Sequence, residues 1–371
     1  MPHPDEIRAS PATASRADAA PSRVLVLAPN WLGDAVMALP AVADIGRHFA
    51  GARMLVAARR GIADLFHLVP GVDEVHTLAW NGKLLNRAAW RGDVARLREA
   101  RADVAILLPN SFSSAWLLRQ AGIAARWGYG SDLRRRLLTR AARRPSGGAG
   151  DAIHQGEYYQ RLTTQFGIAA GPLEPMLRVP ADATEAARRV LAGRGWSGAS
   201  PLVALAPGAA YGTAKQWIPA HVVRLVTDLA GARGVTCVLV GSRADAASTA
   251  AIRAAVLAAA PAAGEAVIDL AGATSLEILA GVLALSRACV SNDSGAMHVA
   301  AAVGTPVVAM FGPTIEQATR PLARAGVPAQ VLTHDVWCRP CMLRECPIDH
   351  RCMTGIGPER VLAAVDAVVR P

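Results

Sequence analysis

The chain has 371 residues, enough for two domains of ordinary size, and its 52% hydrophobic and 18% charged residues are typical of a globular protein with large cores. It lacks a signal-peptide pattern, and its longest uncharged runs, 197–214 and 294–315, are broken by Gly and Pro. We therefore expect a cytoplasmic protein without membrane spans. Arginine carries nearly all of the +10 net charge, and lysine occurs only at Lys83 and Lys215. Because codon bias alone can produce an Arg- and Ala-rich chain, the net charge is weak support for nucleic-acid binding.

Residues 1–22 are rich in Ala, Pro and Ser and are expected to be disordered. Strands alternating with helices then predict a first doubly wound α/β domain over 23–172. Its strands are expected at 23–28, 52–57, 74–78 and 103–108, with a helix over 35–49 and a Gly-rich loop at 146–150. Polar residues follow two of these strands, namely Asn30 and Asp34 after the first, and Asn110 and Ser111 after the fourth.

A Pro-rich linker at 171–180 precedes a second alternating series, which predicts another doubly wound domain over 173–356. Thr274 and Glu277 have capping-box spacing before a helix at 275–286. A Cys-rich segment (338–352) and a C-terminal helix (357–371) complete the chain. The strands of the second domain are expected at 202–206, 235–240, 267–270, 288–291 and 306–311. Two such parallel-sheet domains would face each other across a cleft, with the strand ends directed into it.

The run from Val290 to Thr314 predicts strand, turn, helix and strand, with the helix opening at Ser294 or Gly295 and closing at Gly304. A helix N-terminus at the carboxyl end of a parallel strand suits a diphosphate, and Gly295 would allow close approach to the backbone. His298 lies about one turn into the helix. An ordinary capped crossover is the alternative.

The loop from Pro207 to Trp217 is Gly-rich, follows a strand and contains Lys215. A compact ammonium there suits a leaving diphosphate, in a chain that otherwise uses arginine. The loop is not a Walker motif, because GK[ST] is missing. A solvated lysine is the alternative.

Two further clusters have more than one interpretation. Seven arginines between Arg126 and Arg144 favour a phosphate-bearing partner or an anionic membrane, with a solvated helix face as the alternative. Cys338, Cys341, Cys346 and Cys352 are compatible with a structural zinc site, with reduced packing thiols, or with redox or cluster chemistry.

Four motifs in this order resemble the ADP-heptose:lipopolysaccharide heptosyltransferases of glycosyltransferase family 9, and they are most similar to heptosyltransferase II. They are Trp31-Leu32-Gly33-Asp34, Leu108-Pro109-Asn110-Ser111, the loop 208–217, and Asn292-Asp293-Ser294-Gly295-Ala296-Met297-His298. The resemblance runs from about Arg23 to the end of the chain. It implies a GT-B fold, in which two Rossmann-like domains bind the acceptor and ADP-heptose respectively, and inverting transfer to heptosyl-Kdo2-lipid A.

The resemblance also implies roles for individual residues. Asp34 would be the general base, although it could merely cap its helix, and the helix N-terminus would lower its pKa. Donor contacts are implied for Thr213, Lys215, Asp293, Ser294, Gly295 and His298, with Lys215 also catalytic. Acceptor contacts are expected for Asn110, Ser111, Arg126, Arg134, Arg135 and Arg136. Asp245 is a doubtful ribose contact.

No metal or other cofactor is implied for catalysis. We expect a monomer that meets the cytoplasmic face of the inner membrane peripherally and binds no nucleic acid. Heptosyltransferase I, or a family member with another acceptor, is the alternative in the same class. A basic nucleic-acid-binding protein with a C-terminal zinc site is the alternative in another class. A nicotinamide oxidoreductase is disfavoured, because neither first strand–helix turn carries GxGxxG.

Overall fold

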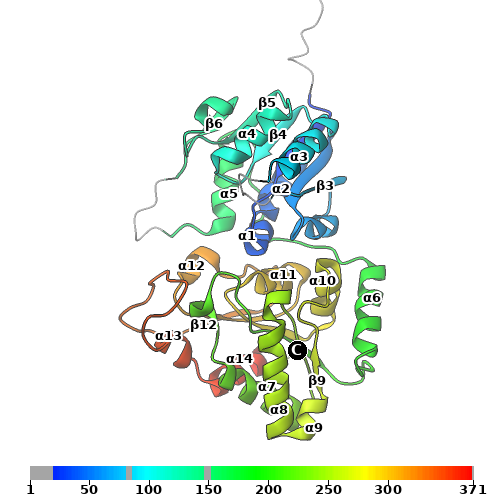
Figure 1. The fold of residues 1–371 in the computed structure, drawn as a ribbon, viewed down its shortest axis with the longest axis vertical. Helices are drawn as coiled ribbons and strands as arrows, with labels where there is room; N and C mark the ends of the chain where they lie inside the picture. The colour runs from blue at the N-terminus through cyan, green and yellow to red at the C-terminus, as the bar shows by residue number, and fades with distance from the viewer. Residues whose placement is uncertain (1–19, 81–85, 146–151, 370–371) are drawn as a thin grey trace, which may run out of the picture.

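The computed structural model describes residues 20–80, 86–145 and 152–369. It contains two six-stranded sheets, in the orders β3-β2-β1-β4-β5-β6 and β12-β11-β10-β7-β8-β9, and every strand pair is parallel. Figure 1 shows the two halves stacked, with the first sheet above the second. The prediction of two doubly wound parallel-sheet units is confirmed.

The first sheet is built from 23–142, and α5 covers it from further along the chain. Its strands are β1 (Arg23–Leu27), β2 (Arg53–Arg59), β3 (Glu74–Leu78), β4 (Val104–Leu107), β5 (Ala125–Tyr129) and β6 (Arg140–Ala142). Its helices are α1 (Leu32–Met37), α2 (Leu39–His48), α3 (Arg87–Glu99), α4 (Phe112–Gln120) and α5 (Gln155–Thr164), with short 3-10 turns η1 (Ala63–Leu68) and η2 (Arg135–Leu137).

The second sheet has strands β7 (Leu202–Ala206), β8 (Thr236–Leu239), β9 (Val267–Asp269), β10 (Ala288–Asn292), β11 (Val307–Phe311) and β12 (Ala329–Thr333). The helices of this half are α6 (Ala181–Ala192), α7 (Pro219–Arg233), α8 (Ala246–Ala259), α9 (Pro261–Glu265), α10 (Leu276–Leu285), α11 (Gly295–Val303), α12 (Glu316–Thr319), α13 (Arg351–Thr354) and α14 (Pro358–Val369), with turns η3 (Thr213–Lys215) and η4 (Arg243–Asp245). α14 packs on α7 and on β10 to β12.

Several local predictions differ from the structure. The helix expected over 35–49 is two helices, which meet at Ala38, just before Pro40. The helix expected over 275–286 is capped by Ser275, whose hydroxyl accepts from the Ile278 amide, and not by Thr274. The disorder predicted for residues 1–22 extends too far, because Ser22 donates its amide and its hydroxyl to the Asp103 carboxylate. Residues 1–19 and the Gly-rich loop at 146–150 lie outside the described residues.

The halves meet through helices that follow the carboxyl ends of their strands. α1, after β1, packs against α11, after β10, and η1 packs against α10. The linker bonds to both sides, since Leu177 donates its amide to Ala302 and Arg178 donates its amide to Leu68. Both sheets therefore present their ligand-binding edges to one shared region. No helix in the described ranges is long and apolar enough to cross a bilayer.

Candidate active site

The N-terminus of α11 forms the centre of the second sheet's carboxyl edge. Ser294 is its N-cap residue in extended conformation, and Gly304 ends the helix at φ 92°, as predicted. Asn292, at the end of β10, accepts from the Trp217 amide (3.0 Å) and donates to the Pro207 carbonyl (2.6 Å). These bonds fix the 207–217 loop beside the helix N-terminus, where amide donors and the helix dipole favour an anion.

Lys215 comes from that loop and forms an ion pair with Asp293 at 2.5 Å. Both side chains are largely buried, with 12% and 6% of their surfaces exposed. Thr314 donates its hydroxyl to the same oxygen of Asp293 (2.7 Å), and the Lys215 ammonium lies 4.7 Å from the Tyr211 ring centre. Lys215 is therefore positioned by three elements and is not a solvated lysine. Thr213, two residues earlier, is exposed.

Asp34 reaches this pair from the other half of the molecule. It lies in the first turn of α1, and the N-cap position of that helix has no side-chain hydrogen bond. Burial raises the pKa of Asp34 to about 6, with Lys215 lowering it and Asp293 raising it further. The expected lowering of the Asp34 pKa is thus wrong, because desolvation by burial is the largest effect on this carboxyl group and raises its pKa. A carboxylate with such a pKa is suited to accept a proton near neutral pH.

His298 lies beneath the contact between α1 and α11. It is 3% exposed, and burial lowers the pKa of its imidazole to about 4, with Asp293 acting against this shift and His154 and Lys215 reinforcing it. A Cβ atom added to Gly33 would lie 3.1 Å from the Cδ2 atom of His298. His298 is therefore a neutral imidazole packed against the Gly33 backbone, one residue from Asp34.

The residues predicted to bind the acceptor separate into different environments. Arg134 is fully buried and donates to the Tyr129 carbonyl (2.7 Å) and to Asn110 (3.2 Å), so the prediction that it faces an acceptor is wrong. Its guanidinium instead fixes Asn110, which donates to the Tyr158 hydroxyl (2.6 Å).

Arg126 is also occupied by the backbone, because its guanidinium donates to the Leu137 carbonyl (2.7 Å) and to those of two other residues. Arg135 and Arg136 are exposed, and Ser111 caps α4 by accepting from the Ser114 amide. The acceptor contacts expected for Arg126, Arg135, Arg136 and Ser111 stay predictions.

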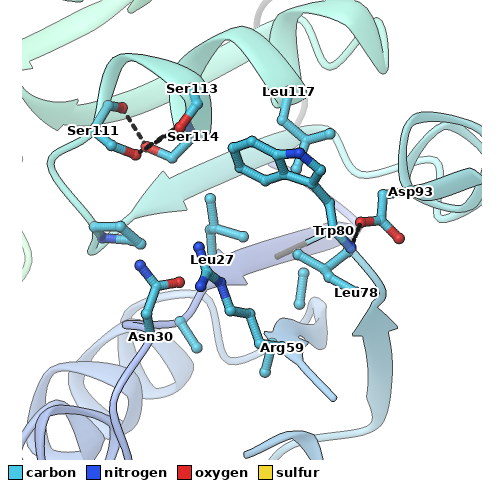
Figure 2. Close-up of a pocket in the computed structure, with 14 residues that line it drawn as sticks. Leu27, Asn30, Arg59, Leu78, Trp80, Asp93, Ser111, Ser113, Ser114 and Leu117 are labelled. Atoms are coloured by element: carbon cyan, nitrogen blue, oxygen red, sulfur yellow. Dashed lines mark hydrogen bonds between the residues drawn. The ribbon is translucent and has the colours of Figure 1, made fainter. Parts of the chain in front are cut away.

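A pocket at the carboxyl edge of the first sheet includes Arg59, which the sequence analysis missed (Figure 2). Asn30, Trp80 and Ser113 line it as well. Arg59 is the last residue of β2 and comes just after the strand that the sequence predicts at 52–57, so its place at a strand end was visible in the sequence. The same criterion had singled out Asp34 and Asn110.

The Cys-rich segment packs on the 207–217 loop, where the Ala214 amide donates to the Arg344 carbonyl (2.9 Å) and the Tyr211 hydroxyl donates to the Met342 carbonyl (2.7 Å). Cys338, Cys341, Cys346 and Cys352 are free thiols. Within the described ranges, no three His, Cys, Asp or Glu side chains are grouped so that they could hold a metal. A structural zinc stays a prediction, which metal analysis of the purified protein would test.

Asp245, the doubtful ribose contact, caps the turn after β8 by accepting from the amide (2.8 Å) and hydroxyl (2.7 Å) of Ser242. A Cβ atom on Gly208 would lie 2.2 Å from its Oδ1 atom, so this carboxylate adjoins the 207–217 loop.

Comparisons with known proteins identify the family and the fold. The family model for glycosyltransferase family 9 (heptosyltransferase) covers residues 93–351. Lipopolysaccharide heptosyltransferase 2 of Salmonella typhimurium is 31% identical, over 84% of this chain and 88% of that protein. The Escherichia coli K12 protein of the same name is 30% identical, over 94% and 98%. The structure of E. coli ADP-heptose LPS heptosyltransferase II superposes with a TM-score of 0.77 at 28% identity, over 94% and 98% of the two chains. The chain belongs to glycosyltransferase family 9, the heptosyltransferases, and has their GT-B fold.

Proposed function

We propose that the protein transfers L-glycero-D-manno-heptose from ADP-heptose, with inversion, to the heptose of heptosyl-Kdo2-lipid A. The observation that carries this proposal is the convergence of Asp34, from the first sheet, on the Lys215–Asp293 pair of the second. A base from one half and an anion site from the other are what a transfer between two separately bound sugars requires.

In the proposed step, an acceptor hydroxyl oxygen attacks the anomeric carbon of the donor from the side opposite the diphosphate. Its proton passes to the Asp34 carboxylate, while the bond between the anomeric carbon and the diphosphate oxygen breaks. The charge that develops on the leaving ADP is stabilised by the Lys215 ammonium and by the N-terminal amides of α11 near Ser294 and Gly295. Asp293 holds Lys215 in place, and His298 supports the α1–α11 contact without carrying charge.

The experiment measures ADP release from ADP-heptose by wild type and Asp34→Asn, with heptosyl-Kdo2-lipid A or Kdo2-lipid A as acceptor. We expect release only with the heptosylated acceptor, and a drop of about 10²–10⁴-fold in the variant, which is the usual contribution of general base catalysis. The variant should still bind ADP.

Release with Kdo2-lipid A alone would assign the first heptose transfer instead. Release with neither acceptor, together with salt-sensitive binding of nucleic acid, would refute a transferase function.

A further inference from the structure

The pocket of Figure 2 lies where β1, β2 and β4 end and α4 begins. Arg59 extends from the end of β2 into its middle, and Asn30, from the β1–α1 connection, points toward the guanidinium (Figure 2). Ser111 and Ser113 line it from the first turn of α4. Strand ends and a helix N-terminus thus surround one arginine.

The Arg59 guanidinium has no counter-ion in the described part of the chain. Among residues 20–80, 86–145 and 152–369 it forms neither an ion pair nor a side-chain hydrogen bond. Burial lowers the pKa of Arg59, and no acidic neighbour offsets this effect. A half-buried guanidinium is costly to leave unpaired, so its presence in a pocket favours an anionic ligand.

The one acid in the pocket wall does not serve as that partner. Asp93 is 1% exposed, and its two carboxylate oxygens accept from the amides of Ala79 (2.9 Å) and Trp80 (2.8 Å). These bonds fix the carboxylate against the end of β3, away from Arg59 in Figure 2. The lining that remains near the guanidinium is neutral or donating.

The N-terminus of α4 adds to the positive character of the pocket. The Ser111 hydroxyl accepts from the Ser114 amide (3.3 Å) and lies 3.1 Å from the Ser113 hydroxyl. The positive end of the nine-residue helix α4 therefore enters the pocket on the side of these two serines. Arg59, the serine hydroxyls and the helix end together offer what a carboxylate or phosphate binds.

We propose that this pocket binds an anionic group of the acceptor, a sugar carboxylate or a phosphate, and that Arg59 is its cationic contact. The inference rests on the proposed function, since it specifies which group of the acceptor the protein recognises. Asn30 lies in the β1–α1 connection, four residues before Asp34 in the first turn of α1, so a group held here lies on the acceptor beside the hydroxyl that Asp34 deprotonates. Arg59 thereby selects acidic acceptors.

The test compares Arg59→Gln and Arg59→Lys with the matched control Arg60→Gln, which removes the exposed neighbouring arginine. For Arg59→Gln we expect the acceptor KM to rise about 10- to 100-fold, because a charge-assisted contact is lost, with kcat and the ADP-heptose KM within about twofold of wild type. Arg59→Lys should recover part of the loss, and Arg60→Gln should resemble wild type. Calorimetric titration of O-deacylated acceptor into the ADP-bound protein gives a second readout that is independent of turnover.

Two modified acceptors, one reduced to the alcohol at its sugar carboxylates and one dephosphorylated, identify the group. If the effect of Arg59→Gln disappears with the reduced acceptor, the ligand is a carboxylate, and if it disappears with the dephosphorylated acceptor, the ligand is a phosphate. If Arg59→Gln raises the KM equally for both modified acceptors, this inference alone is refuted. The same holds if the variant leaves the acceptor KM unchanged while the wild type is active. A wild type without acceptor-dependent ADP release would refute the proposed function itself.

Discussion

The Lys215 ammonium and the Asp293 carboxylate form a buried ion pair of 2.5 Å, although they come from the connections after two different strands. The pair links the loop after β7 to the N-terminus of α11, and the Thr314 hydroxyl adds a third connection from beyond β11. The cation that would neutralise a leaving diphosphate is therefore fixed before any ligand binds.

Removing Lys215 should destabilise the protein as well as weaken donor binding. Lys215→Met leaves Asp293 buried without its partner, and we expect the free energy of unfolding to fall by about 3–5 kcal/mol at pH 7, measured by urea denaturation. The control is Arg224→Ala, which breaks a pair whose arginine is 62% exposed. That change should cost less than about 1 kcal/mol. Equal losses in both variants would contradict the structural role given to Lys215.

The ionisation of Asp34 should control activity near neutral pH. Its pKa of about 6 predicts that kcat/KM rises as pH increases through about 6 and then levels off, because the ionised carboxylate is the form that acts as the proposed base. The raised pKa of Asp34 also lowers the stability of the folded state. The unfolded chain loses the proton near pH 4, whereas the folded chain keeps it until about 6. Stability is thus lost as pH rises through this window, by up to about 2–3 kcal/mol.

Asp34→Asn should accordingly be more stable than wild type at pH 8, by about 1–2 kcal/mol, and closely similar at pH 4. Thermal unfolding at both pH values measures this difference. A variant that is less stable at pH 8 would show that the carboxylate contributes favourable contacts that outweigh its desolvation.

The contact of Gly33 with His298 is already tight. In Gly33→Ala the new methyl group would lie 3.1 Å from the imidazole, so the His298 ring or α1, which carries Asp34, must give by a few tenths of an ångström. We expect kcat to fall by up to about 10-fold, since a displacement of about 1 Å costs about 10²-fold at positioned catalytic groups and this shift is smaller. The control is Gly92→Ala in α3, which meets nothing within 4 Å and should stabilise its helix by about 0.5–1 kcal/mol at unchanged activity. Full activity in Gly33→Ala would exclude this packing constraint.

Local sequence pattern was sufficient to predict the strand–helix units that build the site. The β10–α11 connection has an apolar strand, a capping serine and a terminal glycine in one continuous stretch, and all three appear as expected. β5 and β6 were missed because they lie almost entirely in the arginine-rich run 126–144, where these short strands have no apolar alternation. β12, an edge strand of the other sheet, was missed as well.

The errors at the site arise from contacts between distant segments. Arg134 looks like its exposed neighbours in the sequence, yet it is buried because backbone carbonyls and Asn110 accept its hydrogen bonds. Backbone partners leave no trace in residue identity. The raised pKa of Asp34 also depends on distant segments, since burial and the charges of Lys215 and Asp293, from the other half of the molecule, set its value.

His298 should make the protein sensitive to acid. Its pKa is lowered to about 4 in the folded state, so between about pH 6.5 and 4 the unfolded chain binds a proton that the folded chain does not. Stability contributed in this way is present above pH 6.5 and lost as pH falls toward 4, by up to about 3 kcal/mol. Asp34 acts in the opposite direction over part of this range, and burial also lowers the pKa of His154, so the comparison must be between variants.

His298→Gln replaces the imidazole with a group that does not titrate. We expect the difference in unfolding free energy between pH 7 and pH 4.5 to shrink by about 2 kcal/mol relative to wild type, measured by urea denaturation at each pH. His48→Gln, which removes an exposed histidine at the end of α2, should leave that difference unchanged. If His298→Gln retains the full acid sensitivity of wild type, the imidazole binds its proton equally well in the folded and the unfolded chain, and burial beside Gly33 does not keep it neutral.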